Sequence, residues 1–353
     1  MCSPPCTTGH PPVGSPELVV DLHDPVNAAV PPDWDLFVEK ATLLPTWRWA
    51  VVRANAFGRS GRFLAAVIRD GESVVALANL RLRGPRRVGL GVVDVEAPGS
   101  SALPGLALDV GAEPLGRTPV DAALVRQTVI ALERTLRAEF GRSLALIWYR
   151  QVYAHLLPIL TQGVAITYAG APVAYFRNSY PDYDQYLSSL SKSRRVDQRR
   201  LMRRSDEDPS ITITWGAVTP EFDVQRFYDL VLATDRRNQQ QRWPPRRYPS
   251  RQVIDALLGS PATRMLSYHR DGELICGSLV IDHPATPLSS AYGALDPHAG
   301  GRSGIWFDQM GRVMRWLVES KRAGLIGGKG LSGLKREVGH QSIPQWSVLR
   351  RLR

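Results

Sequence analysis

The sequence predicts a mixed α/β protein in which one structural unit is used twice, with mostly antiparallel sheets flanked by helices. Two apolar segments, residues 63–80 and 265–281, each carry Arg-Asp-Gly-Glu between two apolar runs. The same order of helical and strand-like segments surrounds both copies. The chain has 353 residues, which is long enough for two domains with separate cores.

The Asp-Gly pair inside each copy predicts a β-hairpin, because glycine accepts the positive φ of a tight turn. We therefore expect hairpin turns at Gly71 and Gly272. One shared string of four residues could arise by chance. The shared order of elements around both strings makes internal duplication the better interpretation.

In the first copy we expect a helix-rich segment before the hairpin, then a strand, a helix and a strand, at residues 33–51, 88–95, 120–140 and 144–149. In the second we expect two helices before the hairpin, then a strand, a helix and a short strand, at residues 221–238, 250–258, 288–295, 305–323 and 325–328. The predicted division is a disordered tail at 1–17, a first unit at 18–172 and a second unit at 173–353.

The composition excludes several classes of protein. Hydrophobic residues make up 44% and charged residues 22%, as in globular proteins. No apolar run approaches the roughly 18 residues of a membrane span, and the Pro-rich start lacks the order of a secretory signal. The three cysteines, Cys2, Cys6 and Cys276, suggest a reducing, cytoplasmic compartment without a disulfide framework. The scattered histidines predict no metal site.

The net charge of +11 favours an anionic partner such as nucleic acid, although a generally basic proteome would also produce it. The excess concentrates in a predicted basic helix at residues 186–204. Its candidate phosphate-binding side chains are Lys192, Arg194, Arg195, Arg199, Arg200, Arg203 and Arg204. Like charges four residues apart repel each other, and a bound polyanion such as tRNA relieves that repulsion. The alternative is a solvated face that pairs with acidic residues, including Asp206–Asp208.

Two further segments suggest ligand contacts. A Pro-containing loop at residues 236–248 mixes arginines with Trp243 and Tyr248, a combination that suits phosphates and stacked bases. With Tyr292 and Trp306, these aromatics are the candidates for a substrate pocket. The Gly-rich residues 300–304 precede a helix, where backbone N–H groups can hold phosphate, and Arg302 is a further phosphate-binding candidate.

The C-terminal segment carries a family resemblance. It reads Gly-x-x-x-Leu-Lys-x-x-x-Gly from Gly330 to Gly339. This resembles the Phe-Lys-x-x-Phe-Gly segment of Fem-type aminoacyltransferases and CelD-type acyltransferases, which belong to the GNAT superfamily. Leu334-Lys335 and Val338-Gly339 take the matching places. The run Tyr-Leu-Ser-Ser-Leu-Ser-Lys-Ser-Arg-Arg from Tyr186 is similar to the family's approach to its second unit. The likeness extends from about residue 30 to the end.

The resemblance implies tandem GNAT-like domains that transfer an acyl or aminoacyl group to an amine, without a tightly bound cofactor. It places Lys335 near the reacting groups, where its ammonium can stabilise an oxyanion or hold the tRNA 3′ end. The family's coiled-coil insertion is absent. So is the acetyl-CoA signature Arg/Gln-x-x-Gly-x-Gly/Ala, in whose place residues 300–304 lie. Asp282, Asp308 and Glu337 are equally ranked candidates for a general base.

The leading prediction is transfer from aminoacyl-tRNA to an amine acceptor, such as a peptide, a cell-wall precursor or a natural-product intermediate. One alternative is an acyl-CoA-dependent N-acyltransferase. The other is a non-catalytic protein that binds nucleic acid on a GNAT-like scaffold. Because the basic helix, the Gly-rich loop and Lys335 all lie in the second unit, we expect the chemistry there or between the units.

Overall fold

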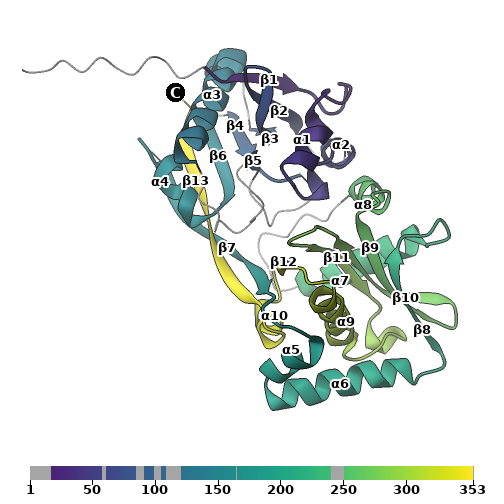
Figure 1. Cartoon of the computed structure of the whole chain (residues 1–353). Coiled ribbons are helices and arrows are strands. Elements are labelled where there is room, and N and C mark those ends of the chain that lie inside the picture. Colours follow the sequence, from purple (N-terminus) through teal and green to yellow (C-terminus); the bar gives the residue numbers. More distant parts are fainter. Residues whose placement is uncertain are drawn as a thin grey trace, which may run out of the picture.

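A computed structural model describes residues 17–57, 61–84, 91–98, 105–108, 121–163, 165–239 and 250–352. Its strands form one mixed sheet in the order β1-β2-β3-β4-β6-β13-β7-β12-β11-β10-β9-β8, with β5 beside β3 (Figure 1). The strands are β1 Val19–His23, β2 Arg62–Asp70, β3 Ser73–Arg83, β4 Gly91–Val95, β5 Leu106–Leu108, β6 Leu144–Val152, β7 Ala165–Arg177, β8 Ile211–Ala217, β9 Thr263–Arg270, β10 Glu273–Ile281, β11 Leu288–Ala294, β12 Gly324–Gly328 and β13 Gln341–Arg351. The helices are α1 Trp34–Lys40, α2 Trp49–Phe57, α3 Ala122–Phe140, α4 Leu157–Leu160, α5 Tyr183–Ser189, α6 Lys192–Asp206, α7 Val224–Gln239, α8 Arg251–Leu258, α9 Ile305–Glu319 and α10 Ser332–Glu337. A mixed α/β fold with helices flanking the sheet is therefore confirmed.

Both predicted hairpins form. In the second copy, Asp271 and Gly272 both have positive φ between the paired residues Arg270 and Glu273. In the first copy the two-residue loop is shifted by one position, to Gly71 and Glu72 between the paired residues Asp70 and Ser73. The shared Asp-Gly signal thus produces the same motif with slightly different turns.

The helices cover the sheet differently in the two halves. In the first half, α3 packs on one face of the sheet through residues such as Leu132 and Leu136, while α1 and α2 pack on the other. In the second half, α5, α6 and α9 cover one face and α7 and α8 the other. Close approach of α7 requires glycine at Gly277, because a Cβ there would lie 2.6 Å from Cδ2 of Phe227.

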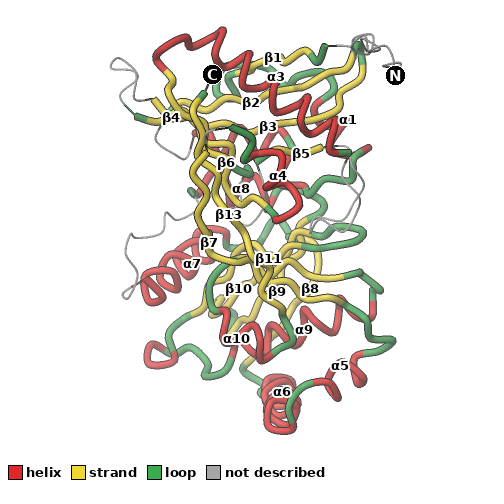
Figure 2. The backbone as a smooth tube through the Cα atoms, turned by 90° about the vertical axis from the view of Figure 1, so that its left-hand side faces the viewer, coloured by secondary structure: helices red, strands yellow, loops and turns green. Residues whose placement is uncertain are grey.

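The C-terminal strand joins the two halves. β13 lies between β6 and β7, pairing Trp346 with Val152 on one side and with Ala169 on the other. The two long strands β7 and β13 run side by side from one half of the molecule to the other (Figures 1 and 2). The predicted division between residues 172 and 173 falls inside β7, and part of the predicted second unit completes the sheet of the first.

Contacts between helices also fix the halves. Leu44 and Val51 of the first half belong to the same core cluster as Val253 and Leu257 of α8. Nearby, Nε2 of His283 donates a hydrogen bond of 2.7 Å to the carbonyl oxygen of Thr42. The two halves therefore share both a sheet and a core.

The helix-rich segment predicted at 33–51 is present as α1 and α2. They are separated by residues 41–48, which include Thr42 with a positive φ and a short 3₁₀ turn that begins at Pro45. The basic segment at 186–204, which was predicted as one helix, needs correction. α5 ends at Ser189, and α6 begins after Ser191, whose Oγ accepts from the backbone N–H of Arg194 at 3.3 Å. The predicted tail lies almost wholly outside the described residues.

Candidate functional site

The two halves differ at their parallel strand pairs. In the first half, β4 and β6 stay paired from Gly91 with Leu144 to Val95 with Tyr149. In the second half, β11 and β12 pair in register only at Leu288 and Ile326. The registered parallel ladder between β11 and β12 therefore ends after a single pair, two residues before the carboxyl end of β12. Ligands of α/β sheets bind at the carboxyl ends of neighbouring parallel strands.

Lys335 lies near the carboxyl end of β12. Its side chain is buried, and Nζ donates a hydrogen bond of 2.5 Å to the carbonyl oxygen of Gly327. α10, which carries Lys335, is held by the bend through Gly328, Gly330 and Leu331, all with positive φ. The structure thus places the ammonium predicted to be catalytic just after the single registered pair of β12 with β11. Its catalytic role stays a prediction.

His340, which the sequence did not single out, lies beside Lys335. Its ring is 3% exposed, and neither ring nitrogen has a hydrogen-bond partner within the described residues. Burial, followed by the nearby Lys335 ammonium, lowers the pKa of His340 to about 3, so the ring is neutral at pH 7. A Cβ at Gly327 would lie 2.9 Å from Nε2 of His340, so only glycine fits there. The sequence offered one indication for His340, which is its position directly after Gly339, the last residue of the C-terminal motif.

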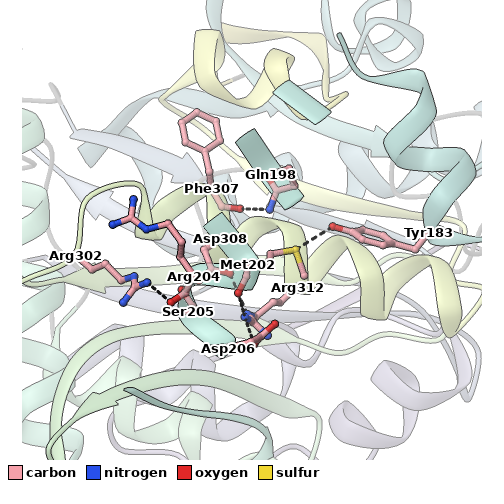
Figure 3. A network of polar contacts seen from close by, with 10 residues as sticks. All are labelled: Tyr183, Gln198, Met202, Arg204, Ser205, Asp206, Arg302, Phe307, Asp308 and Arg312. Atoms are coloured by element: carbon pink, nitrogen blue, oxygen red, sulfur yellow. Dashed lines mark hydrogen bonds and ion pairs between the residues drawn. The ribbon is translucent and has the colours of Figure 1, made fainter. Parts of the chain in front are cut away.

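The basic helix α6 is fixed on one side by a buried stripe. Gln198, Met202 and Ser205 point inward at helical spacing. Nε2 of Gln198 donates to the carbonyl oxygen of Phe307 at 2.9 Å, and the Tyr183 hydroxyl donates to the sulfur of Met202 at 3.3 Å (Figure 3). α6 is therefore positioned against α9 and α5 by specific contacts.

A buried carboxylate strengthens this anchorage. Asp308 of α9 is 1% exposed and accepts a hydrogen bond from the Ser205 hydroxyl (Figure 3). The Arg312 guanidinium donates to Asp308 at 3.0 Å and to Asp206 of α6 at 2.7 Å. Burial raises the pKa of Asp308, and the contacts with Ser205 and Arg312 oppose that rise. The predicted candidate base is thus engaged in holding α6.

The other candidate bases are also paired. Oδ2 of Asp282 accepts from Arg322 at 3.2 Å and from Arg264 at 3.3 Å. Glu337 of α10 forms an ion pair with Arg194 of α6. All three candidate bases are therefore held in ion pairs, and Glu337 is the one that shares a helix with Lys335.

The outward face of α6 carries exposed cations in weak pairs. Arg200 pairs with Asp197 at 2.9 Å, Arg199 with Asp184 at 3.3 Å and Arg203 with Glu207 at 3.8 Å. Exposed pairs of this kind contribute only about 0–1 kcal/mol, so phosphates can replace the carboxylates at little cost. Within the described residues, Lys192 and Arg204 have no ion pair, and Arg195 donates to the Ser188 carbonyl at 3.1 Å. The predicted pairing with acidic neighbours is thus present beside a cationic surface.

Arg194 connects the basic helix to the Lys335 segment. Its guanidinium lies 3.8 Å from the ring centroid of Phe307 and pairs with Glu337, two residues after Lys335. A ligand on α6 and a reacting group at Lys335 would therefore contact neighbouring parts of one surface.

The Gly-rich loop before α9 is occupied by the protein's own groups. Arg302 donates at 2.6 Å to both Asp208 and the carbonyl oxygen of Arg204 (Figure 3 draws Arg204 and Arg302). Leu201 of α6 lies over the helix start, since a Cβ at Gly304 would be 2.7 Å from its Cδ2. Arg302 is thus a C-terminal anchor of α6 in this structure, and its phosphate-binding role stays a prediction.

The structure describes two of the four substrate-pocket candidates, Tyr292 and Trp306. Tyr292 packs against the core under α9, where burial raises its pKa and its hydroxyl meets Cys276. Trp306 stacks edge-on against Phe307 with 4.9 Å between centroids. Trp243 and Tyr248 lie outside the described residues.

Across the described residues, no group of three or more His, Cys, Asp or Glu side chains is arranged to hold a metal ion. No described helix combines the length and the apolar character that crossing a membrane requires.

Comparison of the sequence with protein-family models and with curated proteins gives no match. Solved structures do match the fold. The C-terminal domain of a putative lysylphosphatidylglycerol synthetase from Agrobacterium fabrum is 12% identical, with a TM-score of 0.56 over 89% of this chain and 92% of that one. The corresponding synthetase structure from Bacillus licheniformis is 11% identical, with a TM-score of 0.55 over 91% of each chain. FemX is 11% identical, with a TM-score of 0.57 over 89% of this chain and 95% of that one. The chain therefore shares the fold of FemX and of these synthetase domains, as the resemblance predicted.

Proposed function

We propose that this protein transfers an aminoacyl group from aminoacyl-tRNA to an amine acceptor and so forms an amide bond. The observation that carries the proposal is the position of the Lys335 ammonium near the carboxyl end of β12. The helix that carries Lys335 is joined to the cationic helix α6 by the ion pair of Glu337 with Arg194. The structural likeness to FemX and to lysylphosphatidylglycerol synthetases supports an acyl-transfer function at the level of the fold.

The reaction needs little more than positioning and charge stabilisation. The lone pair of the acceptor amine attacks the ester carbonyl, and an oxyanion forms as the C–N bond is made. The C–O bond to the terminal ribose then breaks, and the ribose oxygen receives the proton that the amine loses. An ammonium aimed at the oxyanion contributes about 10²–10³-fold in rate, and the Gly327 carbonyl holds Nζ of Lys335 in place for that role.

The choice of tRNA as donor rests on α6. Its exposed arginines offer the electrostatic contacts that dominate binding to a phosphate backbone. An acyl-CoA donor would instead need phosphate contacts at the loop before α9. There Arg302 is engaged by Asp208 and the Arg204 carbonyl, and Leu201 covers Gly304. These contacts favour tRNA over coenzyme A.

The experiment offers both donors to the same protein. Purified protein is incubated with a panel of amines and either tRNA charged with labelled amino acids or labelled acetyl-CoA. We expect label in an amide product from charged tRNA only. Product from acetyl-CoA alone, unaffected by ribonuclease, would support the acyl-CoA alternative. A shift of tRNA on a gel without product from either donor would support the non-catalytic alternative.

A further inference from the structure

One edge of β7 has no strand partner over half its length among the described residues. β13 pairs with one edge of β7 from Ala165 to Tyr175, while β12 pairs with the opposite edge only from Ala174 to Arg177. Residues 165–173 therefore present an open edge, which we call the β7 edge. At about 3.3 Å per residue it is roughly 30 Å long, enough to pair with a peptide of about seven residues.

The β7 edge lacks the usual protection of an exposed edge strand. Its sequence, Ala-Ile-Thr-Tyr-Ala-Gly-Ala-Pro-Val, contains no charged residue. Ile166 is 64% exposed and Tyr168 is 42% exposed. Natural proteins normally cover such edges or interrupt them with charges, because unpaired N–H and C=O groups are a template for another strand. The interruptions are Pro172, which lacks an N–H group, and a register shift of β13 between Ile343 and Gln345. Both lie at the end of the edge nearest β12, and residues 165–170 pair with β13 in regular register.

The β7 edge leads directly to Lys335. β12 occupies the same side of β7 and ends where Gly328 pairs with Ala174. A strand added to the β7 edge would continue the line of β12 beyond Gly328. Both existing neighbours of β7 are antiparallel to it. An added strand with the same direction would have its N-terminus beside Gly328, next to the Gly327 carbonyl that holds Nζ of Lys335.

We propose that the β7 edge binds an extended peptide as an additional antiparallel strand, and that the N-terminal amine of this peptide is the acceptor of the transferred group. The acceptor assignment rests on the proposed function, whereas the peptide-binding assignment does not. In the transfer step, the N-terminal nitrogen forms the new C–N bond and the ester C–O bond breaks. The released ribose oxygen takes the proton that the amine loses.

The side chains along the edge predict which peptides fit. Ile166 and Tyr168 are two residues apart and share one face of the strand, where Tyr168 also contacts Trp148 with 6.1 Å between ring centroids. Alternate peptide side chains on that face should be apolar. Close to Gly328 the edge carries only Gly170, Ala171 and Pro172, so it leaves room for the first peptide residues. Main-chain bonds would supply affinity and the apolar face would supply selectivity.

The binding claim is tested by hydrogen exchange on the full chain. The probes are the amide-capped peptide Gly-Val-Thr-Val-Thr-Val with a free N-terminus, its N-acetylated form, and a form methylated at alternate backbone nitrogens. With the first two, the outward amides of residues 165–173 should exchange at least about tenfold more slowly, as expected for newly paired strand amides. The methylated peptide should give no protection. Equal exchange with and without the first two peptides overturns the proposal.

A matched pair of variants excludes a nonspecific effect. Ile166→Lys places a charge on the β7 edge, while Ile130→Lys makes the same change at a similarly exposed position on α3. Peptide affinity should fall about tenfold or more in the first variant and stay unchanged in the second. Equal loss in both contradicts edge binding.

Transfer assays separate this inference from the proposed function. Charged tRNA should label the free peptide at its N-terminus and leave the acetylated form unlabelled. If the peptide slowed hydrogen exchange at the β7 edge but no donor gave transfer, the peptide-binding proposal would stand and the proposed function would be refuted. Transfer to small amines without peptide protection, or equal labelling of the acetylated peptide, would remove the acceptor assignment instead.

Discussion

Nζ of Lys335 donates a hydrogen bond of 2.5 Å to the carbonyl oxygen of Gly327, the penultimate residue of β12. This bond fixes a buried ammonium near the carboxyl end of β12, just after the single registered pair of β12 with β11. The neutral ring of His340 lies against the same glycine. The geometry around Lys335 therefore depends on the absence of a side chain at Gly327.

Replacing Gly327 with alanine should disturb this arrangement. The new Cβ would lie 2.9 Å from Cδ2 and Nε2 of His340, so the ring must move. We expect a loss of stability of about 1–3 kcal/mol, as for other overpacked sites, and at least about a tenfold fall in transfer rate. Denaturant unfolding and initial rates measure the two effects. Gly333→Ala is the matched control, because a Cβ at Gly333 meets no atom within 4 Å. Equal behaviour of the two variants would contradict this reading.

Charge reversal on α6 should weaken tRNA binding. The triple variant Arg195→Glu, Arg199→Glu, Arg203→Glu removes three cations from one face of the helix. The slope of log affinity against log salt should then become shallower by roughly two to three, since each phosphate contact contributes about 0.7–0.9. Filter binding at several salt concentrations provides the measurement. The control reverses the exposed Arg126, Arg134 and Arg142, which changes the net charge equally. The same loss in both variants would show only an effect of net charge.

Removal of the Asp308 carboxylate should loosen α6. Asp308→Ala leaves the Arg312 guanidinium and the Ser205 hydroxyl without their buried partner. Breaking a buried pair by removing one member costs about 3–5 kcal/mol, so we expect a fall of about 3 kcal/mol in the free energy of unfolding. Asp197→Ala, which removes an exposed pair with Arg200, should change that free energy by less than about 1 kcal/mol. Similar values for the two variants would refute the anchoring role of Asp308.

The hydrogen bonds of His283, which connect the two halves, predict that the free energy of unfolding depends on pH. Nδ1 of His283 accepts from the backbone N–H of Thr286 at 2.9 Å, and Nε2 donates to Thr42, so the folded protein requires a neutral ring. Burial lowers the pKa of His283, and Arg322 also lowers it, while the Thr42 contact and Asp282 oppose the shift. A lowered histidine pKa gives stability above the unfolded value of 6.5, which is lost as the pH falls through the folded value.

The free energy of unfolding should therefore fall between pH 7.5 and pH 5.5, and His283→Gln should reduce that fall. The histidines His23, His155, His269 and His340 also have lowered pKa values, so part of the dependence will remain. The control is His298→Gln on an exposed turn. If His283→Gln left the slope of the free energy of unfolding against pH unchanged, His283 would not cause the dependence.

Local chemistry explains which features could be predicted from the sequence. The two Asp-Gly turns are encoded within short segments, and both predicted hairpins form. The break before α6 was also encoded, in Ser191, but the charge run from Lys192 onward suggested one continuous helix. In a sequence-based prediction, a single N-cap residue such as Ser191 counts for less than a long run of helix-compatible charged residues.

Nonlocal relationships could not be predicted in the same way. The insertion of β13 between β6 and β7 depends on pairing Trp346 with residues nearly two hundred positions earlier. The neighbourhood of His340 depends on Gly327 across a turn and a short helix, and no spacing rule connects them. The engagement of Arg302 by Asp208 likewise requires α6 to lie beside the start of α9.

Single-turnover transfer from charged tRNA tests the central claim most directly. Excess protein is mixed with tRNA carrying a labelled amino acid and an amine acceptor, and amide product is followed over time for the native chain and for Lys335→Met. The account predicts product with the native chain, loss of product after ribonuclease treatment of the donor, and a rate about 10²–10³-fold lower for Lys335→Met with tRNA affinity unchanged. Formation of product from ribonuclease-treated donor, or an unchanged rate in Lys335→Met, would contradict the account.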